Sequence, residues 1–271
     1  MINFRGKLSS EKPLVMGILN VTTDSFYDGG KYRTDDDILA RANAILQEGG
    51  DIIDIGAMST RPNAIEIPEN EEIDKILHAV SLLRAAFPEA VISVDTYRSK
   101  VAETAIKSGA DMINDISGGT FDPEMIPVIG RLQVPYCLMH TTAKPDTMQQ
   151  NTTYDDILAD ILKFFGNQIA KLHEYHVHDI IIDPGFGFGK TLEQNYFLMK
   201  NLETFHHIGL PILVGISRKS MIYKLLDTDP QHAMNGTTVL NTIALMKGAS
   251  ILRVHDVKEA VEARKIAMQI L

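Results

Sequence analysis

The chain has 271 residues, of which 45% are hydrophobic and 23% are charged. This composition is that of a globular protein with a sizeable core, and it excludes disordered and fibrous classes. The formal net charge is -9 and no long basic run occurs, so a nucleic acid is not an expected partner. No apolar stretch reaches the roughly 20 residues of a membrane span, and residues 1–13 lack the apolar segment of a signal peptide. We therefore expect no membrane partner and a cytoplasmic location.

Eight short apolar runs rich in β-forming residues follow one another along the chain. They are interpreted as buried parallel strands, because such strands lose the polar alternation of half-exposed strands. The runs are residues 15–19, 52–55, 91–94, 112–116, 136–139, 180–182, 212–216 and 251–254.

Amphipathic helical patterns lie between these runs. One begins after Thr34, a predicted N-cap with Asp37 three residues on, and its apolar residues keep to one face until Gly49 ends it. A strand followed by a helix, repeated over about 250 residues, is typical of an α/β protein with a (β/α)₈ TIM barrel. We predict such a barrel as a single domain over residues 1–271, with an open doubly wound sheet as the alternative.

Polar side chains follow the apolar run at the carboxyl end of each predicted strand. In a barrel these ends surround the active site. Helix capping or turn formation explains any one such residue but not all of them together. They predict a polar basin with both signs of charge, formed by Asn20, Asp54, Ser59, Thr60, Arg61, Asp95, Asn114, Asp115, His140, Asp183, Ser217, Arg218, Lys219, Arg253 and His255.

The loop at residues 183–191 is rich in glycine. It is not a phosphate-binding Walker A loop, because Pro184 stands where that motif needs a glycine. The glycines would let a flat ligand approach the backbone, with Phe188 available to stack on it, although a tight structural loop is an equal alternative. Lys219 could form a Schiff base, but Ser217 and Arg218 beside it favour hydrogen bonds and anion contacts.

Cysteine and histidine positions give no metal site. The single cysteine, Cys137, lies in an apolar run, where a buried side chain is favoured over a nucleophile. The histidine pair at 176 and 178 and the pair at 206 and 207 lack a matching third ligand, so they are expected on the surface.

These polar residues belong to segments that resemble the dihydropteroate synthase family. The segments occur in the family's order, at residues 16–26, 53–56, 59–62, 93–96, 113–119, 139–140, 183–190, 215–220 and 253–255. The resemblance implies a homodimer and a transferase that joins p-aminobenzoate to 6-hydroxymethyl-7,8-dihydropterin diphosphate in folate biosynthesis, releasing pyrophosphate. It also implies a dissociative substitution assisted by Mg²⁺, without a protein nucleophile. The family pattern is interrupted at Thr23, at residues 57–58 and at residues 141–145.

The resemblance also assigns roles to single residues. It implies a pterin pocket formed by Asp95, Asn114, Ile116, Met139, Asp183, Phe188, Gly215 and Lys219. It implies a p-aminobenzoate side formed by Phe26, Thr60, Arg61, Pro62 and Ser217. It implies that diphosphate binds Asn20, Arg253 and His255, with Asn20 as the Mg²⁺ ligand. The residues expected to carry catalysis are Asp95, Asn114, Asp183, Lys219, Arg253 and His255.

Barrel closure adds a spatial expectation. The last strand of a closed barrel pairs with the first, so Asn20 should lie beside Arg253 and His255. An arginine fork suits phosphate oxygens. The alternative is that Arg253 pairs with a carboxylate and only stabilises the barrel rim. Two other functions also stay open: a methyltetrahydrofolate-dependent methyltransferase with a similar barrel, and a catalytically silent paralogue that binds pterin.

Overall fold

The structure, a computed structural model, describes residues 12–21, 34–58 and 66–271. In these residues eight parallel strands form one sheet, in the order β6-β5-β4-β3-β2-β1-β8-β7. A parallel bridge between Ile182 and Ile212 joins β6 to β7 and closes the barrel. The predicted (β/α)₈ barrel is therefore confirmed, and the open sheet is wrong. The strands are β1 (Leu14–Asn20), β2 (Ile52–Gly56), β3 (Val91–Asp95), β4 (Met112–Asp115), β5 (Tyr136–Met139), β6 (Ile180–Asp183), β7 (Leu213–Val214) and β8 (Ile251–Val254).

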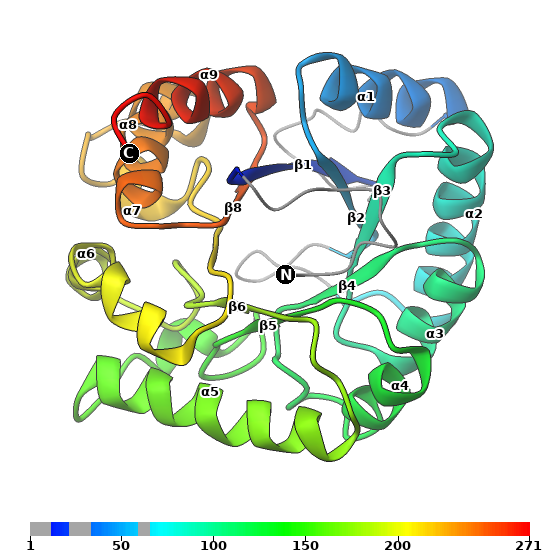
Figure 1. The fold of residues 1–271 in the computed structure, drawn as a ribbon, viewed down its shortest axis with the longest axis horizontal. Helices are drawn as coiled ribbons and strands as arrows, with labels where there is room; N and C mark the ends of the chain where they lie inside the picture. The colour runs from blue at the N-terminus through cyan, green and yellow to red at the C-terminus, as the bar shows by residue number, and fades with distance from the viewer. Residues whose placement is uncertain (1–11, 22–33, 59–65) are drawn as a thin grey trace.

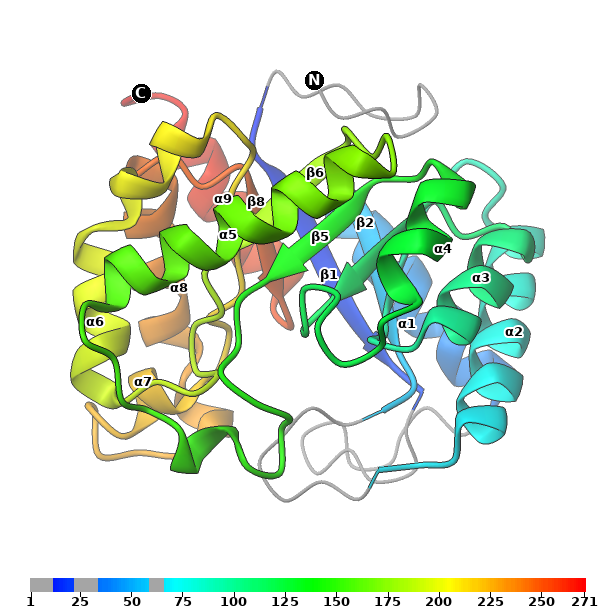
Figure 2. The same ribbon diagram turned by 90° about the horizontal axis from the view of Figure 1, so that it is seen from below.

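The helices form a ring around the strands in chain order (Figure 1). They are α1 (Asp35–Gln47), α2 (Glu69–Ala86), α3 (Ser99–Lys107), α4 (Met125–Leu132), α5 (Ile157–Glu174), α6 (Leu192–Lys200), α7 (Ser220–Tyr223), α8 (Met234–Met246) and α9 (Val257–Ala267). Short 3₁₀ helices occupy Met148–Gln150, Leu202–Ile208 and Pro230–His232. Seen from the side, α5 crosses over β5 and β6 (Figure 2). Among the described helices, none has the length and apolar character needed to cross a bilayer.

Local sequence determines where these elements begin. Thr34 caps α1 as predicted, because its hydroxyl accepts the Asp37 N–H at 3.2 Å while the Asp37 carboxylate accepts the Thr34 N–H at 3.4 Å. The seventh strand is shorter than the predicted 212–216. It pairs with β8 only through Leu213 and Val214.

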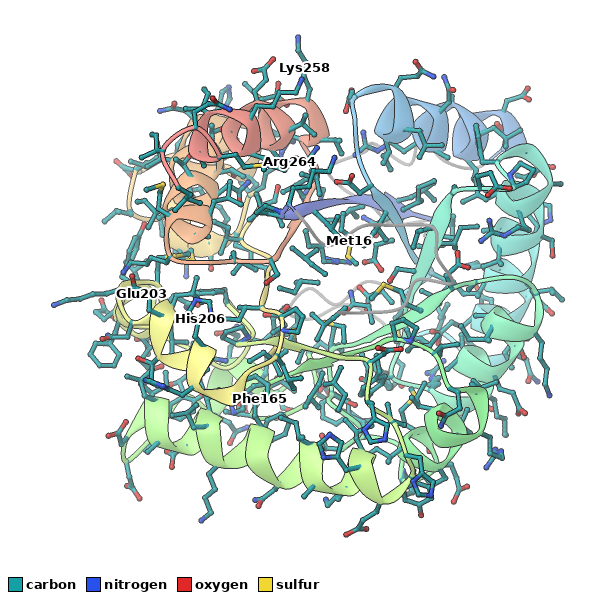
Figure 3. The ribbon with its side chains drawn as sticks, viewed as in Figure 1. Met16, Phe165, Glu203, His206, Lys258 and Arg264 are labelled. Carbon is teal, nitrogen blue, oxygen red and sulfur yellow. The ribbon has the colours of Figure 1, made fainter. Side chains whose placement is uncertain are left out.

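Two apolar layers form the core. The larger fills the space between strands and helices, where Figure 3 shows Phe165 between α5 and the sheet. The smaller lies inside the strands and includes Met16, while Lys258 points away from the barrel. Every strand contributes to this inner layer, whose members are Leu14, Met16, Ile52, Val91, Met112, Cys137, Ile181, Leu213 and Ile251. Cys137 is fully buried there, as expected.

Candidate active site

A polar layer lies next to the inner apolar layer, towards the carboxyl ends of the strands. Side chains alternate between the two faces of a strand, so the residue two positions after the last inner-layer residue of each strand also points inward. The eight positions reached in this way are Ile18, Asp54, Ser93, Asn114, Met139, Asp183, Gly215 and Arg253. Five of them carry polar or charged side chains at the carboxyl half of the barrel, which is where barrel enzymes place their chemistry.

Arg253 is the centre of a charge network in this layer. Its Nε donates to Oδ2 of Asp54 at 2.7 Å, and an Nη donates to Oδ2 of Asp95 at 2.7 Å. The same Asp54 oxygen accepts the amide of Asn114 at 3.2 Å. These hydrogen bonds connect side chains of four strands, β2, β3, β4 and β8. Residues predicted to bind the pterin and a residue predicted to bind the diphosphate therefore belong to one network. The ion pairs expected under the rim-stabilising alternative are present.

The carboxyl group of Asp95 holds its proton unusually tightly. Burial and, to a smaller extent, the neighbouring Asp54 carboxylate raise the pKa of Asp95 to about 7, against the opposing effect of Arg253. One guanidinium thus serves two buried carboxyl groups. A polar ligand that donates hydrogen bonds would stabilise the ionised form of Asp95.

A second group of polar side chains surrounds the glycine-rich loop after β6. Oδ1 of Asp183 accepts the N–H of Gly185 at 2.7 Å, and Nζ of Lys219 donates to the carbonyl of Phe186 at 2.5 Å. Nζ of Lys219 also lies 4.5 Å from the centre of the Phe188 ring. Burial lowers the pKa of Lys219 to about 8, although Asp183 partly offsets this. Burial also raises the pKa of Asp183.

Apolar residues line the space beside these groups. Ile116, Met139 and Phe188, all predicted for the pterin pocket, pack in one buried cluster with Tyr97 and Met148. A side chain at Gly215 would lie 3.7 Å from Cβ of Arg253 and 4.0 Å from Oδ2 of Asp183. The missing side chain therefore leaves room between an arginine and a carboxylate. The predicted pterin set is brought together from several strands.

His255 and Ser217 form a separate pair at the end of β8. Oγ of Ser217 accepts the backbone N–H of His255 at 3.1 Å and lies 3.1 Å from its Nδ1. Burial, with Arg253 and Arg218 nearby, lowers the pKa of His255 to about 3. The imidazole is therefore neutral at physiological pH. The neighbouring Arg218 is bound by Asp256 through two hydrogen bonds, at 3.0 and 2.5 Å.

β8 pairs with β1, as barrel closure requires. Arg253 of β8 lies opposite Met16 of β1, and β1 ends at Asn20, four residues after Met16. A side chain on Gly56 would meet Oδ1 of Asn20 at 3.3 Å and Cβ of Asp95 at 3.8 Å. Asn20 is thus above the level of Arg253 and on the side of Asp95. Phe26, Thr60, Arg61, Pro62 and the departure at Thr23 lie outside the described residues.

Comparison with known proteins places this geometry in a family. Residues 16–255 match the model of the pterin binding enzymes. The dihydropteroate synthase of Escherichia coli K12 is 43% identical over 96% of this chain and 92% of that protein. The chain belongs to the dihydropteroate synthase family. A sulfonamide complex of the Yersinia pestis synthase superposes with a TM-score of 0.93 at 43% identity, covering 97% of this chain and 96% of that chain. The Xanthomonas albilineans synthase with 4-aminobenzoic acid gives 0.91 at 34% identity, covering 99% and 97%.

As a member of this family the protein is a transferase. Asp54 was expected in the polar basin without a specific role, whereas Ser93 and Tyr97 were not expected in the site. Asp54 holds both Arg253 and Asn114. Ser93 stands beside Asp54 in the β2–β3 register, and Tyr97 belongs to the apolar cluster. The signal for Ser93 was available, because it follows Val91 of the inner apolar layer by two positions.

At Gly185 the backbone passes so close to a neighbouring segment that no side chain fits. A side chain there would lie 1.9 Å from the carbonyl oxygen of His140, and its φ is +72°. Gly209 has a similar φ of +76° but nothing within 4 Å. We expect Gly209→Ala to cost about 1–2 kcal/mol of unfolding free energy from strain alone. Gly185→Ala should cost about 1–3 kcal/mol more because of the clash, and should weaken ligand binding. Urea unfolding of both variants measures the difference, and equal losses would contradict the close approach.

Proposed function

We propose that the enzyme joins p-aminobenzoate to 6-hydroxymethyl-7,8-dihydropterin diphosphate by a dissociative substitution, with Mg²⁺ bound to the diphosphate. The observation that carries this proposal is the pair of buried carboxyl groups, Asp95 and Asp183, at the carboxyl ends of β3 and β6. These side chains are only 8% and 5% exposed. Buried carboxylates are costly unless a partner donates to them, and a pterin edge carries several N–H donors.

The remaining polar groups suit the other edges of a pterin. The Asn114 amide can donate and accept, and the Lys219 amino group can donate to ring acceptors. Phe188 supplies an apolar face next to Lys219. Met139 and Ile116 add apolar surface beside it, since both are buried in the same cluster as Phe188. Hydrogen-bonding edges between apolar faces give both orientation and specificity.

The reaction needs charge placement rather than a nucleophile. The C–O bond between the pterin methylene and the diphosphate breaks, and its electron pair leaves with the diphosphate oxygen. The amine of p-aminobenzoate then forms the new C–N bond, and its nitrogen loses a proton to water. Asp95 and Asp183 stabilise the cationic pterin carbon, while Arg253 stabilises the leaving group. A guanidinium has five N–H donors, so the hydrogen bonds to Asp54 and Asp95 leave others for phosphate.

Asn20 is the proposed protein ligand of the magnesium ion. In the described part of the chain, no three histidine, cysteine or acidic residues cluster as a metal site. Mg²⁺ commonly keeps several waters and binds through few protein oxygens plus substrate phosphates. An amide oxygen at the end of β1 fits that pattern. When bound, the ion would neutralise charge on the diphosphate. His255, being neutral, would contribute a hydrogen bond rather than charge.

The p-aminobenzoate side is proposed to include Ser217, together with Phe26, Thr60, Arg61 and Pro62. Ser217 stands where β7 leads towards α7, two residues before Lys219. We also propose that the reaction takes place in the cytoplasm, and the single buried cysteine is consistent with a reducing compartment.

Pyrophosphate release with both substrates is the decisive experiment. We expect release that requires p-aminobenzoate and stops when EDTA removes Mg²⁺. A silent pterin-binding paralogue would bind pterin but release nothing. A methyltransferase would consume methyltetrahydrofolate and ignore the diphosphate. Release that persists in EDTA would refute the magnesium assignment alone.

We propose in addition that a second copy of the chain covers an apolar face of α8. Val239, Ile243 and Met246 are 51%, 37% and 40% exposed on one side of this helix, and Leu225 and Leu226 are 57% and 53% exposed nearby in sequence. Monomers seldom expose contiguous apolar patches of this kind. Light scattering should give twice the chain mass, and Ile243→Glu should halve it. Ile266→Glu, on exposed α9, is the control and should remain dimeric.

A further inference from the structure

A buried lysine outside the assigned site organises the glycine-rich loop. Lys190 is only 3% exposed. Its Nζ donates to the carbonyls of Gly185 at 3.0 Å and Phe188 at 2.9 Å, and lies 3.1 Å from Nδ1 of His140. An ammonium group has three N–H donors, so these three acceptors use all of them.

The histidine in this cluster is an acceptor. Burial and the adjacent Lys190 lower the pKa of His140 to about 2, so its ring is neutral and Nδ1 can accept a hydrogen bond from Lys190. The His140 backbone N–H also donates to the Asp183 carbonyl at 3.0 Å. Lys190 therefore joins the segment after β5 to the segment after β6.

The carbonyls held by Lys190 belong to the same loop that shapes the proposed pterin pocket. Gly185 donates its N–H to Asp183, and Phe188 stacks below Lys219. The carbonyl of Phe186, between them, accepts from Lys219. The loop turns through three glycines with positive φ, Gly185, Gly187 and Gly189. Such backbone allows the carbonyls of residues 185 and 188 to converge on one amino group.

Packing alone does not account for a lysine at this position. Burial of an ammonium is unfavourable, and it lowers the pKa of Lys190 to about 7. Apolar residues of similar volume commonly stabilise a buried site as well as or better than a charged group. The three hydrogen bonds explain what the charge contributes. Without them the Phe188 carbonyl would lose the Lys190 donor, and the Gly185 carbonyl would keep only the Phe188 N–H at 3.1 Å.

We propose that Lys190 is a positioning residue for pterin recognition. It acts through the loop, by holding the Gly185 and Phe188 carbonyls so that the Phe188 ring and Asp183 face the ligand. This role rests on the proposed function, because it requires that the pocket binds a pterin. It differs from the roles of Asp183 and Lys219, since Lys190 itself does not touch the ligand.

A double-mutant cycle tests the proposal. Binding of 6-hydroxymethylpterin would be measured by calorimetry for Lys190→Met, Phe188→Ala and the double variant. We expect each single variant to weaken binding by about tenfold, and the double variant to lose little more than one single variant, because both changes remove the same contact. Asn114→Ala is the comparison, since Asn114 is held by Asp54 on another strand. Its loss should combine multiplicatively with that of Lys190→Met.

The outcomes separate this role from a purely structural one. Lys190→Gln, which keeps N–H donors without charge, should bind pterin better than Lys190→Met, and it replaces that variant in the cycle if Lys190→Met fails to fold. Lys200→Met, a change on exposed α6, should behave as the parent. Lower thermal stability with unchanged pterin affinity, or losses at Lys190 and Phe188 that multiply, would overturn the proposal. A parent chain that binds no pterin would refute the proposed function itself.

Discussion

Asp183→Asn is expected to weaken pterin binding by about 10- to 100-fold. The change keeps the shape of the side chain but replaces an acceptor-only carboxylate with a group that also donates. One oxygen of Asp183 is already used by the Gly185 N–H, so the other is the one that we expect to accept from the ligand. Loss of a hydrogen bond to a charged group costs about 1.5–3 kcal/mol, which corresponds to this range.

The same substitution should also alter Lys219. Asp183 raises the pKa of Lys219, which otherwise falls because of burial. Without that carboxylate, Lys219 loses its proton at a lower pH than about 8 and is less charged at neutral pH. Calorimetry between pH 6 and 9 should show the affinity of Asp183→Asn falling with pH earlier than that of the parent. Asp160→Asn, on exposed α5, is the matched control. An unchanged affinity for pterin in Asp183→Asn would remove Asp183 from the site.

Arg253→Ala is expected to lower the unfolding free energy by about 3–5 kcal/mol as well as turnover. Removal of one partner from a buried ion pair leaves an uncompensated charge, and here two carboxylates, Asp54 and Asp95, lose the same partner. Arg253→Lys keeps the charge but has no fork to reach both carboxylates, so its loss should be smaller. Arg131→Ala removes an exposed arginine of α4 and should leave stability within about 0.5 kcal/mol of the parent.

The stability difference should depend on pH in a defined direction. A carboxyl group whose pKa is raised in the folded state lowers stability as pH rises above its unfolded pKa of about 4, and the penalty is complete above the folded pKa. Asp95 has a pKa of about 7 even with Arg253 present. Without the arginine this pKa should rise further, so the parent and Arg253→Ala should differ most above pH 7 and converge towards pH 4. Urea unfolding at several pH values measures this, and a difference that does not change with pH would show that the ionisation of Asp95 is not coupled to Arg253.

The arginine variant also connects the two halves of the site. If Arg253 served the diphosphate alone, Arg253→Ala would weaken inhibition by pyrophosphate and spare binding of free pterin. Because Arg253 holds Asp95 at 2.7 Å, we expect pterin affinity to fall as well. Affinities for pyrophosphate and pterin, measured on one preparation, distinguish these results.

The elements of the barrel could be predicted because their signals are local. Apolar runs mark buried parallel strands, and the Thr34 capping box uses only residues three apart. β7 departs from its prediction because its length depends on pairing with β8, which begins 38 residues after Leu213. The polar strand ends were also readable, since the barrel places them all at one face.

Tertiary structure alone decided how those polar residues are connected. Asp95 and Arg253 are 158 residues apart in sequence and on strands that are not neighbours in the sheet, so no local pattern could pair them. Lys190 follows a loop of glycines, and lysine is most often exposed. Its burial results from carbonyls that the loop turns inward and from His140, which directly follows β5. Sequence therefore determined which residues reach the end of the barrel, whereas packing across the barrel decided which of them share a charge or a hydrogen bond.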